Sequence, residues 1–269
     1  MNPILPTRSV AKPWGRDALP PPFEAPAGER IGEIWFEPPA ALPELLVKYI
    51  FTSQALSVQV HPSDAETRAR GLGRQGKEEC WLVIAAEPGA RLGIGFREAI
   101  GAEAMRAAAL DGSIESLMAW HPVAAGDFFY IPAGTVHAIG AGVSLIEVQQ
   151  NSDITYRLYD YGRPRELHLD EGVAVARGEP YAARWHRRVE ARGEQTLVDG
   201  PLFRLDRIDG PPSEAVRLAY GEAPLLVIPR EVGFSVGGID VAVGECALAR
   251  AIDEVAVTGG ALGLIARPA

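Results

Sequence analysis

Short apolar segments separated by turn-forming residues run through most of this 269-residue chain. The 29 glycines and 22 prolines are spread along the sequence and do not cluster. Residues 56–61 alternate apolar and polar side chains, which is typical of a strand with one buried face. The pattern predicts a mainly β protein without a fixed-period repeat.

One helical segment interrupts the predicted strands. Ala, Glu, Met and Leu dominate residues 97–120, and Asp111-Gly112 should end a first helix before Ser113 begins a second. We expect a β domain over residues 1–190 that carries this insertion, and a smaller C-terminal β module over residues 191–269.

Two other segments show no regular periodicity. Residues 1–43 are rich in proline, and we expect them to be mostly irregular apart from a short strand at 32–36. Residues 63–78 are polar and are expected to form a mobile loop.

Charge and cysteine content exclude several classes of protein. The formal net charge is −9 and no long Lys/Arg run occurs, which argues against a nucleic-acid or membrane-surface partner. Cys80 and Cys246 alone cannot make a disulfide framework. No apolar run reaches the ~18 residues of a membrane span, and the first residues lack an apolar signal core. We therefore expect a cytoplasmic protein.

Candidate metal ligands lie on several predicted strands. Gln59 and His61 share one face of a strand, Glu79 begins another, and His137 follows the turn at residues 132–135. Neutral imidazoles and carboxylates are good ligands for Zn²⁺. Spacing alone leaves open that the histidines are hydrogen-bonded interior residues and that Glu79 is a solvated loop residue.

The sequence around His137 is more specific. Residues 126–137 fit the pattern G-x5-P-x-G-x2-H, which resembles the second conserved motif of the cupin superfamily. Ala141 stands where that motif usually has asparagine, and Gln59-x-His61 replaces the H-x-H of the first motif.

Four segments together resemble the type I mannose-6-phosphate isomerases, a cupin family. They are LSVQVHPSD (56–64), GKEECW (76–81), GDFFYIPAGTVHAIG (126–140) and QQNSDITYRLYDYGR (149–163). The resemblance implies a cupin-type jelly-roll barrel, one Zn²⁺ per chain, and interconversion of mannose 6-phosphate and fructose 6-phosphate through a cis-enediol(ate). It extends over residues 12–176 and is poor after residue 200.

The resemblance also assigns roles to individual residues. It implies a metal held by Gln59, His61, Glu79 and His137, and it makes Arg157 catalytic. A fixed guanidinium would stabilise the negative charge of an enediolate, although Arg157 could instead pair with Asp153 or Asp160. Further implied site residues are Ser57 and Lys77 for substrate binding, with Lys77 and Asp153 as alternatives for proton transfer.

Two other functions remain open from the sequence. The chain could be a non-catalytic cupin that binds a metal and a sugar phosphate. It could also be another cupin enzyme, such as a non-haem iron dioxygenase, although Gln59 among the ligands argues against that chemistry.

Overall fold

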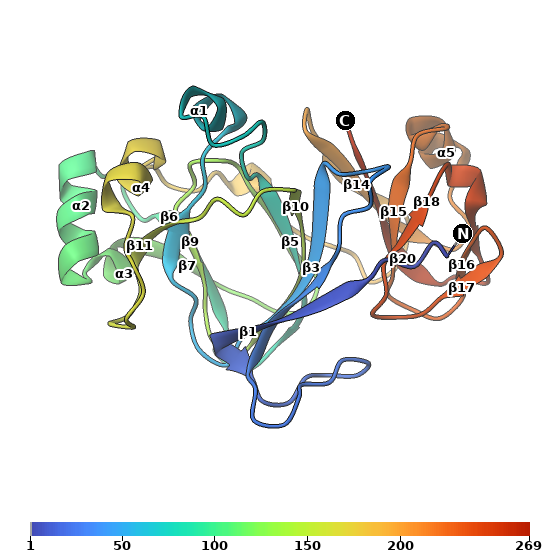
Figure 1. Ribbon diagram of the computed structural model, residues 1–269, viewed down its shortest axis with the longest axis horizontal. Coiled ribbons are helices and arrows are strands. Elements are labelled where there is room, and N and C mark those ends of the chain that lie inside the picture. The colour runs from blue at the N-terminus through green and yellow to red at the C-terminus, as the bar shows by residue number, and fades with distance from the viewer. Residues whose placement is uncertain (1) are drawn as a thin grey trace.

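The computed structural model describes residues 2–269 and is mainly β, as the sequence predicted (Figure 1). Its strands form four antiparallel sheets. None of the helices in the described chain is long and apolar enough to cross a membrane. The helices are α1 (Asp64–Ala69), α2 (Ala102–Asp111), α3 (Ile114–Leu117), α4 (Leu169–Val175) and α5 (Glu214–Tyr220), with short 3-10 turns at Ala183–Trp185 and Ile252–Glu254.

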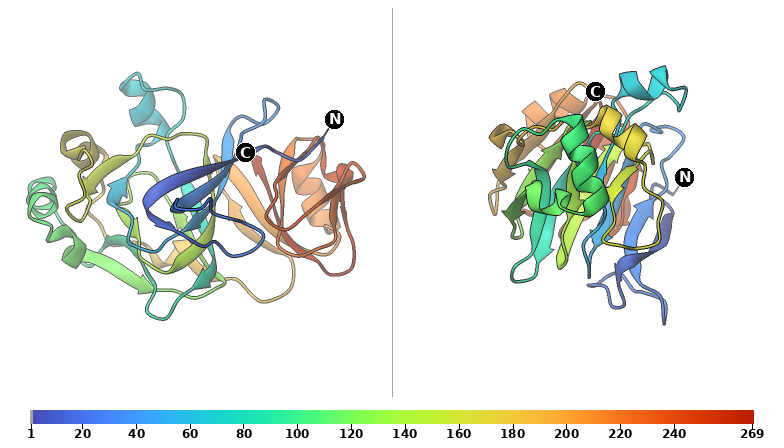
Figure 2. Two further views of the ribbon diagram at one scale, coloured as in Figure 1. Left: turned by 60° about the horizontal axis from the view of Figure 1, so that its bottom comes forward. Right: turned by 90° about the vertical axis from the view of Figure 1, so that its left-hand side faces the viewer.

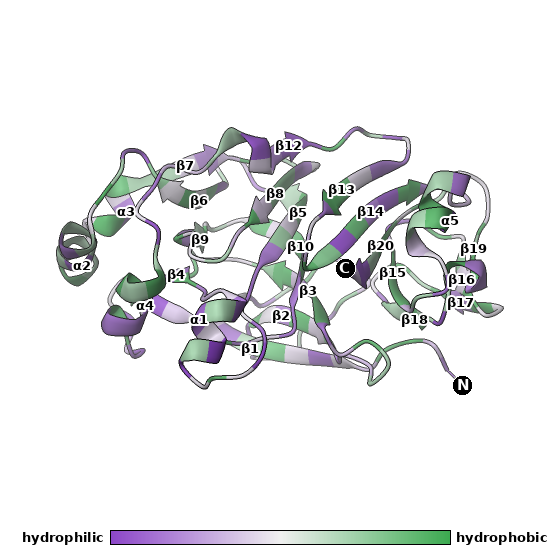
Figure 3. Cartoon of the chain, turned by 90° about the horizontal axis from the view of Figure 1, so that it is seen from above, coloured by the Kyte–Doolittle hydropathy of each residue, from purple (hydrophilic) through white to green (hydrophobic). Residues whose placement is uncertain are grey.

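Two sheets face each other as the walls of a barrel, which Figure 3 shows from above. The larger wall has seven strands, in the order β1 (Thr7–Arg16), β2 (Ile31–Phe36), β3 (Leu45–Phe51), β10 (Val143–Gln150), β5 (Glu79–Ala86), β8 (Asp127–Ile131) and β12 (His186–Arg188). The smaller wall has five, in the order β11 (Tyr156–Tyr159), β4 (Val58–Val60), β9 (His137–Ile139), β6 (Arg91–Phe96) and β7 (Met118–Pro122).

The remaining two sheets make a C-terminal β module beside the barrel (Figure 1). One sheet has the order β13 (Gln195–Asp199), β14 (Phe203–Asp209), β20 (Leu262–Pro268), β15 (Leu225–Pro229) and β18 (Ala247–Ala249). The other has the order β17 (Ile239–Val241), β16 (Phe234–Val236) and β19 (Val255–Val257). The chain passes from the barrel to the C-terminal module between β12 and β13. The domain boundary at residue 190 stays a prediction.

The seven-stranded sheet is buried on both faces, which explains why its central strands are so rich in apolar residues. Successive side chains of a strand point to opposite faces. On β3, Val47, Tyr49 and Phe51 belong to an apolar cluster shared with Phe203 and other residues of the C-terminal module. Ile50 belongs instead to the apolar cluster inside the barrel. The C-terminal module therefore covers the outer face of this sheet.

The helical insertion covers the outer face of the five-stranded sheet. Val58 and Val60 of β4 pack with Met105 of α2, Ile114 of α3 and Val175 of α4 in one buried cluster. Figure 2 shows α2 and α4 in front of the strands when the molecule is viewed from that side. Between these two covered faces, charged and amide side chains such as Lys48, Gln59 and Glu147 point into the barrel interior.

The structure corrects three expectations. Thr7–Arg16 is a ten-residue strand rather than an irregular segment, because it pairs with β2 along the edge of the sheet. The predicted polar loop contains α1, whose first turn is closed by a capping box between Ser63 and Glu66. The C-terminal module contains the unpredicted helix α5. The predicted helix stop is confirmed, since Gly112 ends α2 in the left-handed conformation with φ 82°.

The loop that contains α1 is tied at its base. The amide of Gly76 donates to the Asp64 carboxylate at 2.7 Å, and the amide of Lys77 donates to the carbonyl of Pro62 at 3.0 Å. A Cβ added at Gly76 would lie 2.3 Å from that carbonyl oxygen, so the two chain segments approach too closely for any other residue. This contact sets the spacing between His61 and Lys77.

Gly76→Ala should therefore destabilise the fold. Forcing the two segments apart is expected to lower the free energy of unfolding by about 1–3 kcal/mol, measured by denaturant titration. Gly200→Ala is the matched control, because an added Cβ there meets nothing closer than 3.5 Å. Equal denaturation midpoints for the two variants would contradict the argument.

Candidate active site

Three predicted site residues lie in one row across the five-stranded sheet. Gln59 of β4 is paired directly with Arg157 of β11 on one side and with His137 of β9 on the other. Residues directly opposite each other in an antiparallel pair project to the same face. The strand register therefore brings together residues that lie far apart in the sequence, and Gln59 Nε2 lies 3.3 Å from His137 Nε2.

His61, Glu79 and His137 form a group that could hold a metal ion. One ligand atom from each lies within 4.8 Å of the others, and all three residues are buried. Glu79 comes from the facing sheet, and its carboxylate lies between the histidines, 3.6 Å from His61 Nε2 and 3.4 Å from His137 Nε2. The prediction that these residues converge agrees with this geometry.

Both histidines present an unprotonated nitrogen to the same space. Nδ1 of His61 donates to the carbonyl of Ile154 and Nδ1 of His137 donates to the carbonyl of Thr135, each at 2.9 Å. In the neutral imidazole, Nε2 is then left as the acceptor. Burial and the nearby Lys77 lower the pKa of both histidines, that of His137 to about 4. A neutral imidazole whose Nδ1 is fixed by a backbone carbonyl directs its Nε2 toward a metal ion.

Glu79 supplies the negative charge of this group. Its Oε1 is buried and has no hydrogen-bond partner among the described residues. Burial raises the pKa of Glu79, and the charge of Glu147 raises it further. An unpartnered carboxylate oxygen between two imidazole acceptors fits a divalent cation, because the cation would supply the partner that this oxygen lacks.

Among the described residues, Lys77 is the only positively charged side chain that contacts His61, Glu79 or His137. Its ammonium donates to Glu79 and, at 3.0 Å, to Nε2 of His61. Burial alone would lower the pKa of Lys77, but the carboxylates of Glu79 and Glu147 raise it above its ordinary value. A lysine that keeps its proton is a hydrogen-bond donor and a positive charge rather than a base.

A cavity of about 330 Å³ opens beside this group, between the two sheets. Five of the residues singled out from the sequence line it: Ser57, Gln59, Lys77, Asp153 and Arg157. Its other lining residues are Lys12, Trp14, Glu33, Trp35, Lys48, Ile50, Leu56, Ile139, Glu147, Thr155 and Arg165. Of the predicted ligands only Gln59 lines the cavity, and Gln59 and Lys77 connect its wall to His137 and Glu79.

Sequence reasoning missed a second row of polar residues on the facing wall. Trp35, Lys48, Glu147 and Trp81 lie side by side on β2, β3, β10 and β5. The Lys48 ammonium lies 2.9 Å from Glu147 Oε1 and 4.5 Å from the centre of the Trp35 ring. Trp81 donates to the other Glu147 oxygen at 3.0 Å. The sequence did hold a signal for Lys48 and Glu147, because each is the only charged residue of its strand, LLVKYIF and VSLIEVQQ.

Arg157 forms no ion pair with a carboxylate among residues 2–269. Asp160 binds Arg163 and Arg165 instead, and Asp153 is exposed at the cavity without an ion pair among the described residues. Arg157 donates from Nη1 to the carbonyl of Glu166 at 2.8 Å, while its buried Nε has no partner. The alternative of a structural ion pair is therefore wrong, and this guanidinium keeps donors free for a ligand.

Comparison with known proteins agrees with the motifs. Mannose-6-phosphate isomerase of Streptococcus mutans is 42% identical over 170 residues, 59% of this chain and 52% of that protein. Mannose-6-phosphate isomerase ManA of Bacillus subtilis is 38% identical over 172 residues, 61% of this chain and 54% of that protein. The chain is similar to mannose-6-phosphate isomerases. This confirms the resemblance inferred from the motifs, although the chain spans about half the length of these curated relatives. No protein-family profile matches it.

Solved structures of mannose-6-phosphate isomerases share the fold. The Bacillus subtilis enzyme superposes with a TM-score of 0.78 at 22% identity, over 99% of this chain and 100% of that chain. A putative mannosephosphate isomerase of Archaeoglobus fulgidus gives 0.76 at 18% identity, over 100% and 98% of the two chains. A zinc-bound mannose 6-phosphate isomerase gives 0.71 at 16% identity, over 98% of each chain. These similarities extend through the C-terminal module, where the sequence motifs end.

Lys48→Met should strongly destabilise the protein. It leaves the buried Glu147 carboxylate without its cation, which typically costs about 3–5 kcal/mol of unfolding free energy. Lys12→Met, which removes a partly exposed lysine 3.3 Å from Glu33, should cost about 1 kcal/mol or less. Denaturant titration measures both, and adding Glu147→Gln to Lys48→Met should recover part of the loss. A double variant no more stable than Lys48→Met would contradict a buried pair.

Proposed function

We propose that this chain is a metal-dependent aldose–ketose isomerase that interconverts mannose 6-phosphate and fructose 6-phosphate. The observation that carries the proposal is the position of Arg157, Gln59 and His137 in one row beside a cavity lined with cationic residues. Sequence similarity to named mannose-6-phosphate isomerases supports the choice of substrate.

We propose that His61, Glu79 and His137 hold one Zn²⁺ per chain, with Gln59 as the fourth ligand once its amide oxygen, which accepts from Ser57, turns toward His137. The unpartnered Glu79 oxygen and the two unprotonated Nε2 atoms support this ligand set, as does the zinc in a protein of the same fold. When bound, Zn²⁺ would act as a Lewis acid toward the sugar oxygens. Lys77, which contacts two of these ligands, would remain protonated beside it.

The isomerisation moves the proton on C2 of the aldose to C1 and the proton on O2 to O1. A carboxylate fixed at the cavity wall is suited to carry the carbon-bound proton. Glu147 is held in place by Lys48 and Trp81, whereas Asp153 is exposed. Despite burial, the contacts with Lys48 and Trp81 also lower the pKa of Glu147 to about 2, which makes it a weak base, so both carboxylates stay candidates for this role. The Lys77 ammonium fits the oxygen-bound proton transfer, since its raised pKa keeps it a donor.

Arg157 provides the positive charge that an enediolate requires. Its guanidinium lies opposite Gln59 on the neighbouring strand and has free donors. Charge that develops during the reaction is stabilised most by donors that are already oriented. Lys12 and Arg165 also line the cavity and add positive charge where a substrate phosphate can be held, with Ser57 as a neutral donor.

A coupled assay of mannose 6-phosphate conversion to fructose 6-phosphate, combined with metal analysis, tests the proposal. Turnover that is lost with a chelator and restored by Zn²⁺ supports it. Bound zinc and bound sugar phosphate without turnover would instead indicate the non-catalytic alternative. Stoichiometric iron with oxygen-dependent activity would indicate a dioxygenase.

His137→Ala should abolish metal binding. It removes one of two imidazole ligands and leaves Glu79 beside an empty space, so both zinc content and activity should fall together. Elemental analysis of the purified protein measures the metal. His186→Ala removes an imidazole outside this group, stacked 4.2 Å from Phe129, and should keep full zinc content. Normal metal in the His137→Ala protein would remove β9 from the proposed site.

Arg157→Ala should lower kcat by about 10²–10³-fold while KM changes much less. The reason is that its guanidinium would interact more strongly with the enediolate than with the bound sugar. Arg157→Lys should also be poor, because lysine lacks the planar fork.

Arg106→Ala is the matched control, since this half-exposed arginine of α2 pairs with Asp170 away from the cavity. Steady-state kinetics and zinc content should be normal for it. A raised KM with unchanged kcat in Arg157→Ala would assign the guanidinium to phosphate binding instead.

A further inference from the structure

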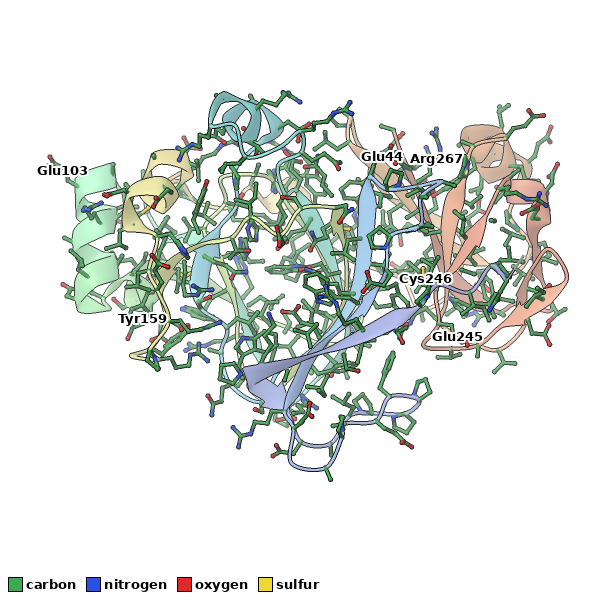
Figure 4. The ribbon with its side chains drawn as sticks, viewed as in Figure 1. Glu44, Glu103, Tyr159, Glu245, Cys246 and Arg267 are labelled. Atoms are coloured by element: carbon green, nitrogen blue, oxygen red, sulfur yellow. The ribbon has the colours of Figure 1, made fainter. Side chains whose placement is uncertain are left out.

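A second cavity, of about 180 Å³, lies between the barrel and the C-terminal module. Its walls come from the loop between β1 and β2, from β3, β5 and β10, and from two loops of the C-terminal module. Figure 4 labels Glu245 and Cys246, which follow this cavity's wall residue Gly244 where the barrel meets the module. The lining residues are Pro20, Pro21, Pro22, Phe23, Tyr49, Phe51, Ile84, Ala85, Ser144, Arg230, Val243 and Gly244.

This cavity is separate from the candidate active site, although the two share a strand. On β3, Tyr49 and Phe51 line the second cavity, whereas Lys48 and Ile50 line the first. The alternation of side chains along a strand accounts for this arrangement. The second cavity therefore lies on the outer face of the seven-stranded sheet, behind the Lys48–Glu147 pair.

Its lining is apolar except for three groups. Arg230 contributes a half-buried guanidinium that forms no ion pair with any carboxylate in residues 2–269. No aspartate or glutamate lines the cavity. Tyr49 is buried with its hydroxyl beside the Arg230 guanidinium, and Ser144 adds a second hydroxyl. Burial raises the pKa of Tyr49, while the nearby Arg230 charge opposes that rise, so the hydroxyl stays protonated as a donor.

We propose that this cavity binds a small monocarboxylate with a compact apolar body. An unpaired guanidinium favours a carboxylate, because the planar fork can donate two parallel hydrogen bonds to it. A single cation balances a single negative charge, and the proline and phenylalanine side chains contact the apolar part. A small number of polar groups in an otherwise apolar concave site is the usual composition of a ligand pocket.

The size of the cavity limits the apolar body. An apolar cavity of about 150 Å³ is sufficient to bind benzene. The present cavity of about 180 Å³ therefore accommodates one six-membered ring or a short branched chain, with its carboxylate directed at Arg230. Ala85 is exposed at one side of the cavity and leaves a route of entry.

Isothermal titration calorimetry with benzoate tests the proposal directly and does not depend on isomerase activity. A ligand of this size is expected to bind one site per chain with a Kd on the order of 1 mM. Benzamide keeps the shape but lacks the charge, and inorganic phosphate keeps a charge but lacks the ring. Both should bind at least about tenfold more weakly than benzoate.

Two variants locate the benzoate site. Arg230→Gln removes the guanidinium, and Ala85→Trp closes the exposed side without changing a buried residue. Each should weaken benzoate binding at least about tenfold at an unchanged melting temperature. Arg250→Gln is the charge-matched control, because this exposed arginine pairs with Glu254 on the surface of the same module. It should bind benzoate as the parent does.

Three results would overturn the proposal. The first is no benzoate binding by the unchanged protein at millimolar concentration. The second is equal binding by the parent and by Arg230→Gln or Ala85→Trp. The third is competition between benzoate and mannose 6-phosphate in all variants alike, which would place benzoate among the cations of the candidate active site.

Discussion

Two lysine–carboxylate pairs inside the barrel hold the polar part of its interior together. Lys48 pairs with Glu147 and Lys77 pairs with Glu79, and all four residues are buried. Removing such charges from water costs free energy that is recovered only when each has a partner at close range. The strands β3 and β10, which carry Lys48 and Glu147, must therefore keep their register, because a slip of one residue would point these charges into the apolar layer on the other face of the sheet.

The covering layers on both outer faces strengthen this constraint. The C-terminal module packs on the seven-stranded sheet and the helical insertion packs on the five-stranded sheet. Because water is excluded from those faces, electrostatic interactions between charges inside the barrel are stronger than they would be at a surface. The same exclusion keeps His61 and His137 uncharged and leaves their Nε2 atoms available as acceptors.

Much of the site was predictable because its residues occur in compact motifs. The turn at residues 132–135 places His137, and alternation along residues 56–61 places Gln59 and His61 on one face. Lys48 and Glu147 were missed because they are 99 residues apart and meet only through the register of β3 and β10. The prolines of residues 1–43 led us to expect an irregular segment and to miss β1. Proline is tolerated in β1 because this strand lies at the edge of the sheet. The capping box of α1 was visible as Ser63 and Glu66, but a six-residue helix has almost no periodicity to detect.

The hydrogen bonds at the base of the α1 loop allow the tip of the loop to change without moving the residues of the candidate site. Contacts at Pro62, Asp64 and Gly76 hold the two chain segments together before the loop departs from the barrel. The entropy of closing a loop grows only slowly with its length. Residues 70–74 are exposed at the far end of the loop, and their hydrogen bonds are made within the loop itself. They can thus be lengthened, shortened or replaced while His61 and Lys77 keep their positions. The loop tip is accordingly a place where related chains can acquire new surface properties without changing the chemistry of the barrel.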